Sequence, residues 1–281
     1  MPTLEQVKDL DRVGSVIVTR PAPDAQRWVD QLQQRGIPAE ALPLIEITSV
    51  PDLTPARDAW VRLEKYAAVM FVSGNAVEHF FAAQRSGALP NTHDLASFNT
   101  VRFMAPGPGT ALVLAAEGVP VMQIDTPPAD ATQFDSEALW KVIGQRDWAG
   151  QRVLIVRGQS GHSGQSGTLD AVGTGREWLA RQLESCGASV DFVVVYERRP
   201  PLFTAAQLQR IAASQGDGSV WLFSSSEALA HLPQGTDWSH ARAIATHSRI
   251  AQAAQAAGWG VVIESRPALE DIVASIELAH P

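Results

Sequence analysis

The second half of this chain repeats the order of the first, and the repeat constrains the fold more than any other feature. The stretch FVSGNAVEHFF (71–81) returns as LFSSSEALAHL (222–232), with Ser73 aligned to Ser224 at an offset of 151. Each copy has an apolar run, then small polar residues, then an alanine-bearing segment. We interpret each as a strand, a tight turn and the start of a helix.

Two further pairs of segments extend the repeat. At the same offset Gly36 aligns with Gly187, each after a predicted amphipathic helix, where glycine is a common stop. Segments 101–121 and 241–262 agree at an offset of 140. Because order and spacing both match, we interpret the halves as approximate copies. The alternative is chance similarity, since all α/β units place glycine after helices.

Short apolar strands alternate with helices in both copies, which predicts an α/β fold with parallel sheets covered on both faces. VIVTR (16–20) and VLIVR (153–157) are predicted strands of β-branched residues, each ending in arginine. Open sheets of this class bind ligands at the carboxyl ends of their strands. Two such domains facing each other would form a cleft lined by both sets of loops.

Composition and charge exclude several classes of function. A formal net charge of −8 argues against nucleic acid or an anionic membrane as partner. The single cysteine, Cys186, excludes an intramolecular disulfide and a cysteine-cluster metal site. No run of 18 apolar residues and no secretory signal is present. We therefore expect a cytoplasmic, soluble monomer with no metal, because no histidine spacing suits one and no apolar patch demands a partner.

The two serine turns are candidate anion sites. Ser73, Asn75, Ser224, Ser225 and Ser226 each fall between a predicted strand and a helix. Unpaired N–H groups at a helix start favour carboxylates or phosphates, and these side chains add further donors. The alternative is that they only cap their helices.

Arginines at matching strand ends are a second candidate. Arg20 and Arg157 could each donate a bidentate pair to a ligand carboxylate, and the alternative is a surface ion pair. Arg249 and Arg266 are further candidates. We interpret the glycine- and serine-rich segment from Ser160 to Gly175 as a mobile surface loop or lid.

Tyr196 and His247 are the candidates for proton transfer. Tyr196 follows three valines, and its hydroxyl is either a weak acid at a binding site or the edge of a core tyrosine. His247 lies in the turn ATHSR as a possible acid or base. APGPGTA (105–111) lacks both the P-loop pattern and the third dinucleotide-binding glycine, so a tight turn is the safer interpretation. No cofactor motif is present.

The ordered set of these segments resembles a known family. VIVTRPAPDAQRWVDQLQQRGIPAEALPLIEI, AAVMFVSGNAVEHF, APGPGTALVLAAEGV, VLIVRGQSG, YERRP and VWLFSSSEAL together resemble uroporphyrinogen-III synthase over nearly all of the chain. The repeat alone would place the boundary between two domains near residues 125 to 150. The resemblance implies instead two flavodoxin-like domains joined by a two-stranded crossover, comprising 1–44 plus 198–281 and 45–197, with the active site in the cleft between them.

The resemblance also implies a reaction. The substrate would be hydroxymethylbilane, a carboxylate-rich linear tetrapyrrole, and the reaction needs neither metal nor cofactor. The terminal hydroxyl leaves as water to give an azafulvene, ring D attacks through its substituted carbon to form a spiro intermediate, and the ring is reinserted inverted. The family's proposed acid is a tyrosine that matches Tyr196, and its serine and threonine turns match Ser73, Thr110, Ser224 and Ser248.

The predicted substrate-binding residues share positions in turns or at strand ends; they are Arg20, Ser73, Gly74, Asn75, Gly107, Thr110, Arg157, Gly158, Ser224, Ser225, Ser226, His247 and Ser248. Many family members have threonine or proline where Gly74 and Thr246-His247 stand. A two-domain protein that closes on a small anionic ligand without chemistry is the alternative function. A nucleotide-sugar transferase is a third, weakened by the lack of a diphosphate loop.

Overall fold

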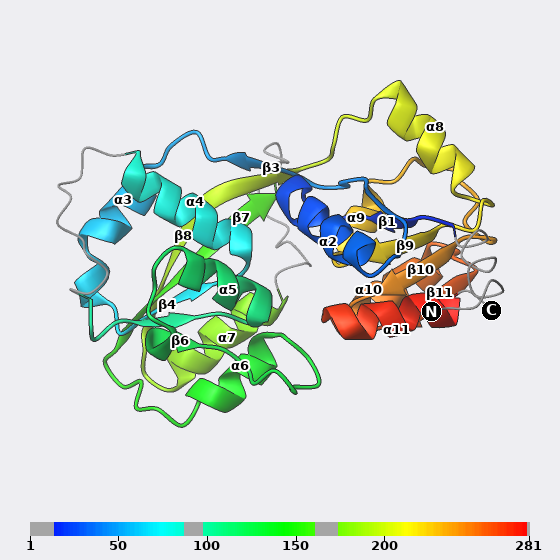
Figure 1. The fold of residues 1–281 in the computed structure, drawn as a ribbon. Coiled ribbons are helices and arrows are strands. Elements are labelled where there is room, and N and C mark those ends of the chain that lie inside the picture. The colour runs from blue at the N-terminus through cyan, green and yellow to red at the C-terminus, as the bar shows by residue number, and fades with distance from the viewer. Residues whose placement is uncertain (1–13, 87–97, 161–173, 280–281) are drawn as a thin grey trace. The chain divides into compact units, whose positions relative to one another are not determined.

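The computed structural model describes residues 14–86, 98–160 and 174–279, and the chain divides into two compact units (Figure 1). Met1–Glu46 with Pro200–Pro281 forms unit 1, and Ile47–Arg199 forms unit 2. The chain therefore passes twice from one unit to the other. Each unit is built around its own sheet, as the α/β prediction requires.

Unit 1 holds a five-stranded sheet of order β11-β10-β9-β1-β2, in which every neighbouring pair is parallel. Its strands and helices are β1 (Val16–Val18), α2 (Ala22–Gln34), β2 (Ala39–Ala41), α8 (Ala205–Ala213), β9 (Val220–Phe223), α9 (Ser226–Ala230), β10 (Arg242–Ala245), α10 (Ser248–Ala256), β11 (Val261–Glu264) and α11 (Leu269–Ala279).

Unit 2 holds a six-stranded sheet of order β3-β8-β7-β4-β5-β6, parallel at every pairing from β8 to β6. Its strands and helices are β3 (Glu46–Ser49), α3 (Thr54–Val61), η1 (Leu63–Lys65), β4 (Ala68–Phe71), α4 (Gly74–Arg85), β5 (Arg102–Met104), α5 (Pro108–Ala116), η3 (Val121–Gln123), β6 (Ile124–Asp125), α6 (Ser136–Ile143), β7 (Arg152–Ser160), α7 (Thr174–Ser185) and β8 (Ser189–Arg199).

The two sheets have one plan, with strands exchanged between the sequence repeats. In unit 1, β1 and β2 come from the first repeat and β9 to β11 from the second; in unit 2, β7 and β8 come from the second repeat and β4 to β6 from the first. With β1 or β7 numbered as the first strand of its unit, the unit 1 sheet runs 2-1-3-4-5, and the unit 2 sheet runs the same once its additional edge strand β3 is set aside; this is the flavodoxin-like order. The expectation of two similar flavodoxin-like sheets is confirmed.

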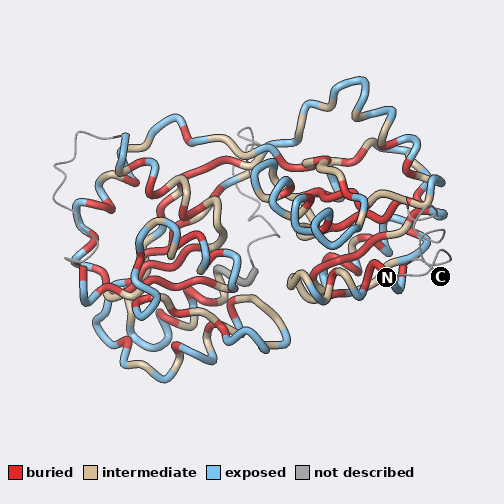
Figure 2. The backbone as a smooth tube through the Cα atoms, in the orientation of Figure 1, coloured by how far each residue is buried: buried red, intermediate tan, exposed pale blue. Residues whose placement is uncertain are grey.

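Buried strands form the middle of each unit (Figure 2). In unit 2, one sheet face packs against α3, α4 and α5 through residues such as Phe71 and Phe80, and the other packs against α6 and α7 through residues such as Met70 and Leu179. In unit 1, α2 and α11 cover one face of the sheet. Both faces are apolar, which explains why the strands read as unbroken hydrophobic runs.

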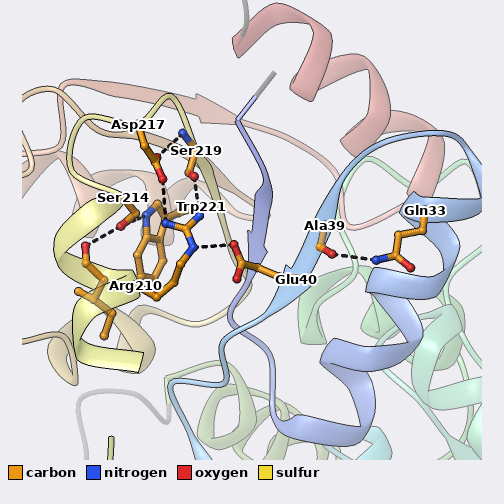
Figure 3. A network of polar contacts seen from close by, with 9 residues as sticks. Gln33, Ala39, Glu40, Arg210, Ser214, Asp217, Ser219 and Trp221 are labelled. Atoms are coloured by element: carbon orange, nitrogen blue, oxygen red, sulfur yellow. Dashed lines mark hydrogen bonds and ion pairs between the residues drawn. The ribbon is translucent and has the colours of Figure 1, made fainter. Parts of the chain in front are cut away.

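Arg210 of α8 joins that helix to the sheet of unit 1 (Figure 3). Its guanidinium donates to Glu40 on β2 at 2.7 Å, to Asp217 at 2.9 Å and to the Ser219 hydroxyl at 2.7 Å. Beside it, the Trp221 indole donates to Ser214, the residue that caps the end of α8. The planar fork of arginine suits three acceptors in different directions.

Helix ends agree with the repeat. Gly36, Gly118, Gly187 and Gly258 follow helices with φ of 77°, 90°, 85° and 86°, the left-handed region where glycine carries no steric cost. Of the predicted loop from Ser160 to Gly175, residues 161–173 lie outside the described residues, and α7 already begins at Thr174. In the described part of the chain, none of the helices combines the length and apolar character that crossing a membrane requires.

Candidate functional site

The serine turns lie where parallel sheets of this kind bind ligands. In each sheet the strand order reverses between two central strands, so that the connections after these two strands run to opposite sides. These strands are β4 and β7 in unit 2, and β1 and β9 in unit 1. A crevice forms outside the carboxyl ends of the strands at such a switch point. Ser73 follows β4 and Ser225 follows β9, so both turns occupy this position.

Ser73 and Tyr196 are brought together across 123 positions of sequence. The hydroxyl oxygens of the two side chains are 3.1 Å apart, and either can be the donor. Ser73 is also the N-cap of α4, where its Oγ accepts from the Ala76 backbone N–H at 3.3 Å. Tyr196 is 3% exposed, so its ring is part of the core while its hydroxyl meets the helix start.

A β-bulge directs Tyr196 toward α4. In the ladder between β7 and β8, Arg157 pairs with Val194 but the next residue, Gly158, pairs with Tyr196, which leaves Val195 extra. Strict alternation would put Val195 and Tyr196 on opposite faces, yet both belong to the core under α4. Bulges near functional sites commonly re-aim a side chain in this way.

Gly158 leaves the room that the Tyr196 ring occupies. A Cβ built on Gly158 would overlap the Cε2 and Cζ atoms of that ring. A glycine inside a strand of β-branched residues is a known sign of a bulge or a close approach. The same sign is present in VLIVRGQS and marks a close approach, but it does not show that β8 carries the extra residue.

His79 is the side chain at this site that the sequence reasoning passed over. Its ring centroid lies 5.7 Å from that of Tyr196, with 33° between the ring planes. Its Nδ1 is 3.3 Å from the Ser49 hydroxyl on β3. Burial lowers the pKa of His79 from its ordinary value, so the imidazole is largely neutral at pH 7.

The start of α4 packs against α5. Gly107 is the N-cap of α5, where a Cβ would lie 2.8 Å from the Cβ of Phe134, and Thr110 is buried in the first turn. A Cβ on Gly74 would lie 3.2 Å from Cγ2 of Val113 on α5. These glycines therefore allow close packing, and APGPGTA forms a tight turn into a helix. Asn75 lies in the first turn of α4, partly buried.

The two strand-end arginines differ from each other. Arg20 pairs with Asp24 at 2.8 Å and lies over the Trp28 ring at 4.7 Å, which corresponds to the ion-pair alternative. Arg157 lies over the Phe192 ring at 4.9 Å. The Nε atom of each arginine is buried with no hydrogen-bond partner in the described part of the chain. Among the described residues only Arg20 of these two is engaged by a carboxylate, so the Arg157 guanidinium is the freer one to bind an acceptor from a ligand.

In unit 1 the serine turn is shifted by one residue from its copy. Ser224, which the repeat aligns with Ser73, is not the N-cap, because α9 begins at Ser226 and Ser225 caps it. The Ser225 hydroxyl accepts from the Glu227 N–H at 3.2 Å. The helix has five residues where α4 has twelve, so the second turn is an imperfect copy of the first.

His247 caps α10 with its side chain. Its Nδ1 accepts from the Arg249 backbone N–H at 3.2 Å and lies 3.4 Å from the hydroxyl of Ser248, the first residue of the helix. Arg266 lies 3.5 Å from the Asp271 carboxylate. These residues belong to the ends of β10 and β11 in unit 1.

Other polar clusters of unit 2 lie apart from the candidate residues. A cavity of about 400 Å³ at the beginning of β7 and β8 is lined by residues that include Tyr66, Arg152 and Asp191, and by none of the predicted ones. Within residues 14–86, 98–160 and 174–279, no three His, Cys, Asp or Glu side chains are grouped as metal ligands.

The pair of hydroxyls can donate one hydrogen outward. If Ser73 donates to the Tyr196 oxygen, the phenol hydrogen is available to a ligand; if Tyr196 donates to Ser73, the serine hydrogen is available. The N-terminus of α4 carries partial positive charge, which favours any negative charge that develops on the phenol oxygen. The arrangement therefore suits a weak acid whose conjugate base is stabilised.

Comparison with known proteins supplies the context for this chemistry. Residues 26–274 match the family model described as "Uroporphyrinogen-III synthase HemD". A curated uroporphyrinogen-III synthase of Chlorobaculum parvum is 30% identical over 72% of this chain and 71% of its own length. The enzyme of the same name from Salmonella typhimurium is 31% identical over 66% of this chain, and the match spans 65% of that relative.

Solved structures are similar in fold. The uroporphyrinogen-III synthetase of Helicobacter pylori has a TM-score of 0.53 at 17% identity, covering 95% of this chain and 100% of its own. A mutant uroporphyrinogen III synthase of Thermus thermophilus has a TM-score of 0.53 at 14% identity, covering 95% and 98%. At these identities the likeness concerns the fold alone.

Proposed function

Because the chain belongs to the uroporphyrinogen-III synthase family, we propose that it cyclises hydroxymethylbilane with inversion of ring D and loss of water. The observation that carries the assignment to particular residues is the contact between the Ser73 and Tyr196 hydroxyls at the switch point of the unit 2 sheet. It is a donor pair at the place where such sheets bind ligands.

In the first step Tyr196 is the acid. The C–O bond of the terminal hydroxymethyl group breaks, and the leaving oxygen takes the phenol hydrogen to depart as water. Ser73 donates to the phenol oxygen as its proton leaves, and the dipole of the twelve-residue helix α4 stabilises the charge that develops there. Gly158 and the bulge hold the ring in place for this transfer.

Carboxylates of the substrate would be bound by helix starts and arginines. In unit 2 the candidates are the first turns of α4 and α5 and the Arg157 guanidinium, whose Nε lacks a hydrogen-bond partner among the described residues. In unit 1 they are Arg20 and the turns at Ser224–Ser226 and His247–Ser248. Backbone N–H groups at helix starts and guanidinium forks both suit carboxylates.

The test is a coupled assay in which hydroxymethylbilane is generated in place and the oxidised products are separated by isomer. Without an enzyme the linear substrate closes uninverted and gives isomer I. We expect the purified protein to shift the product to isomer III. If a demonstrably folded protein leaves isomer I alone, the proposed function is wrong, and binding of a small anionic ligand without chemistry becomes the function to test.

The role of Tyr196 is tested with its matched control, since the chain has two tyrosines. Tyr196→Phe should lower the rate of isomer III formation by about 10²–10⁴, the usual contribution of a positioned acid or base. Tyr66→Phe, which loses a hydrogen bond to Asp191 at 2.9 Å in the same unit, should keep the wild-type rate. Equal rates for all three proteins would remove Tyr196 from the reaction.

Cellular location and assembly are further proposals. We expect a cytoplasmic monomer, as composition indicates, and light scattering after size exclusion would measure the mass directly against 30.2 kDa for one chain. A mass of twice that value at working concentration would overturn the monomer.

A further inference from the structure

His79 is a second titratable side chain beside Tyr196, and the sequence does not reveal its position there. It lies on α4, six positions after Ser73, and its ring is the neighbour of the Tyr196 ring at 5.7 Å between centroids. The two side chains come from different elements, α4 and β8, and meet only because the bulge turns Tyr196 toward the helix.

The contacts of His79 leave one ring nitrogen available. Nδ1 faces the Ser49 hydroxyl at 3.3 Å, which orients the ring. Within the described residues, no hydrogen bond or ion pair engages Nε2. The side chain is only partly buried, so Nε2 can meet a ligand that also reaches Tyr196. When Nδ1 carries the hydrogen and donates it to the Ser49 oxygen, the neutral imidazole is a base at Nε2.

The chemistry at Tyr196 requires such a base. When the hydroxyl leaves from a pyrrole-bound carbon, the neutral azafulvene forms only if the pyrrole nitrogen also loses its hydrogen. An acid alone would leave the cation. We propose that His79 is a catalytic base, whose Nε2 takes the hydrogen of the pyrrole nitrogen while Tyr196 protonates the departing hydroxyl. This inference rests on the proposed function of the site.

The proton inventory closes with these two residues. The C–O electron pair leaves with the oxygen, which gains the Tyr196 hydrogen and becomes water. The N–H electron pair is drawn into the ring, and the exocyclic C=C bond forms as the proton moves to His79. When ring D attacks the exocyclic carbon, the nitrogen recovers its proton from the imidazolium. The proton that the macrocycle finally loses restores the phenol of Tyr196. No outside donor or acceptor is needed.

Burial supports this assignment. It lowers the pKa of His79, with no charged neighbour contributing to the shift, which keeps the imidazole in the basic form at neutral pH. A protonated histidine beside the phenol could not accept the pyrrole proton. Nearness to Tyr196, an oriented ring and a neutral base therefore coincide in one side chain.

Chemical rescue separates a base from a packing residue. In the isomer assay, His79→Ala should lower kcat by about 100-fold with little change in KM, within the range typical of a positioned base. Added imidazole should restore at least about tenfold of the loss, in proportion to its unprotonated fraction between pH 6 and 8. Tyr196→Phe is the control, because imidazole cannot replace its phenol and should restore nothing.

The experiment distinguishes a wrong assignment of His79 from a wrong proposed function. If the wild type forms isomer III and His79→Ala matches it, or loses activity that imidazole never restores, the assignment of His79 is wrong while the function stands. If the wild type forms no isomer III, the function itself fails. Should His79→Ala not fold, His79→Asn keeps an amide group where Nδ1 stands, and must show the same loss of kcat.

A spectroscopic readout checks the contact without turnover. With ¹³Cζ-tyrosine the protein gives two tyrosine signals, which Tyr66→Phe assigns. Titration of His79 below pH 7 should move the Tyr196 signal, and His79→Asn should abolish that movement. A Tyr196 signal that ignores pH in the wild type would contradict the contact on which the inference depends.

Discussion

At the scale of single residues, Tyr196 is held by neighbours that its own strand does not provide. Ser73 meets its hydroxyl, His79 lies beside its ring, and Gly158 leaves the space that the ring fills. Tyr196 and Ser73 are site residues predicted from the sequence. Gly158 is also predicted there, but as a substrate-binding residue and not as the residue that makes room for the tyrosine ring. His79 could not be predicted, because its role depends on which face of β8 the tyrosine occupies.

Gly158→Ala should displace the tyrosine ring. The added Cβ overlaps ring atoms, and overpacking of this kind typically costs about 1–3 kcal/mol of unfolding free energy. A shift of about 1 Å in a reacting group can cost about 100-fold in rate, so isomer III formation should fall by that order. Gly216→Ala is the control, because no heavy atom lies within 4 Å of the new Cβ. It should change neither the unfolding free energy nor the rate of isomer III formation. Wild-type activity in Gly158→Ala would show that the ring position does not matter.

At the scale of elements, ion pairs fix pieces that are too short to be stable alone. The two-residue strand β6 ends in Asp125, which is 5% exposed and receives hydrogen bonds from Arg102 on β5 and Arg146 after α6. Burial alone would raise the pKa of Asp125, but the bonds from Arg146 and Arg102 outweigh it, and the pKa lies below its ordinary value.

The stability that Asp125 contributes should depend on pH with a defined sign. A carboxyl group with a lowered pKa stabilises the fold above its ordinary pKa near 4, and that stability is lost as pH falls through the lowered value. Asp125→Asn should cost about 2 kcal/mol at pH 7 by urea unfolding, less than a fully buried pair because both arginines are 35% exposed. The difference in unfolding free energy between Asp125→Asn and the wild type should decrease toward pH 3.

The exposed pair of Arg35 and Glu270 is the matched control for that experiment. Its side chains are 43% and 74% exposed, so Glu270→Gln should leave the free energy of unfolding close to that of the wild type. If the loss of unfolding free energy in Asp125→Asn is the same at pH 7 and pH 3, the ion pairs of Asp125 do not account for that loss.

The elements also show where sequence reasoning ends. Glycine stops such as Gly36 and Gly187 are local signals, since the left-handed backbone is a property of one residue and its helix. The bulge in β8 is different, because alternation alone puts Tyr196 on the face of Phe192 and Val194. Only the pairing with β7 shows that one residue is extra. The shifted cap at Ser225 is likewise set by where α9 begins.

At the scale of the whole molecule, exchange of strands between the repeats decides which parts can fold alone. Unit 2 is one continuous stretch, Ile47–Arg199, although its strands come from both repeats. The first half of the sequence supplies β1 and β2 to one sheet and β4 to β6 to the other. The predicted domains, 1–44 plus 198–281 and 45–197, follow from the same exchange.

Expression of two fragments tests those domains. Residues 45–197 should give cooperative urea unfolding and dispersed amide resonances, because they carry a complete sheet with helices on both faces. Residues 1–150, a fragment of similar length, should not, because neither of its sheets is complete. A folded 1–150 with an unfolded 45–197 would show that the repeats, and not the exchanged units, are the domains.

Because of the bulge, the number of residues in β8 determines how the strand must pair for the phenol to reach α4. In β8 two residues separate Val193 from Tyr196, and a regular strand of that length would put the phenol on the face opposite Val193. Loss of Val195 would remove the bulge and leave Tyr196 two positions after Val193, on the same face of the sheet. A relative with one residue fewer here would therefore keep the phenol on this face in a regular strand, whereas a strand of the present length without the bulge would turn the phenol to the opposite face.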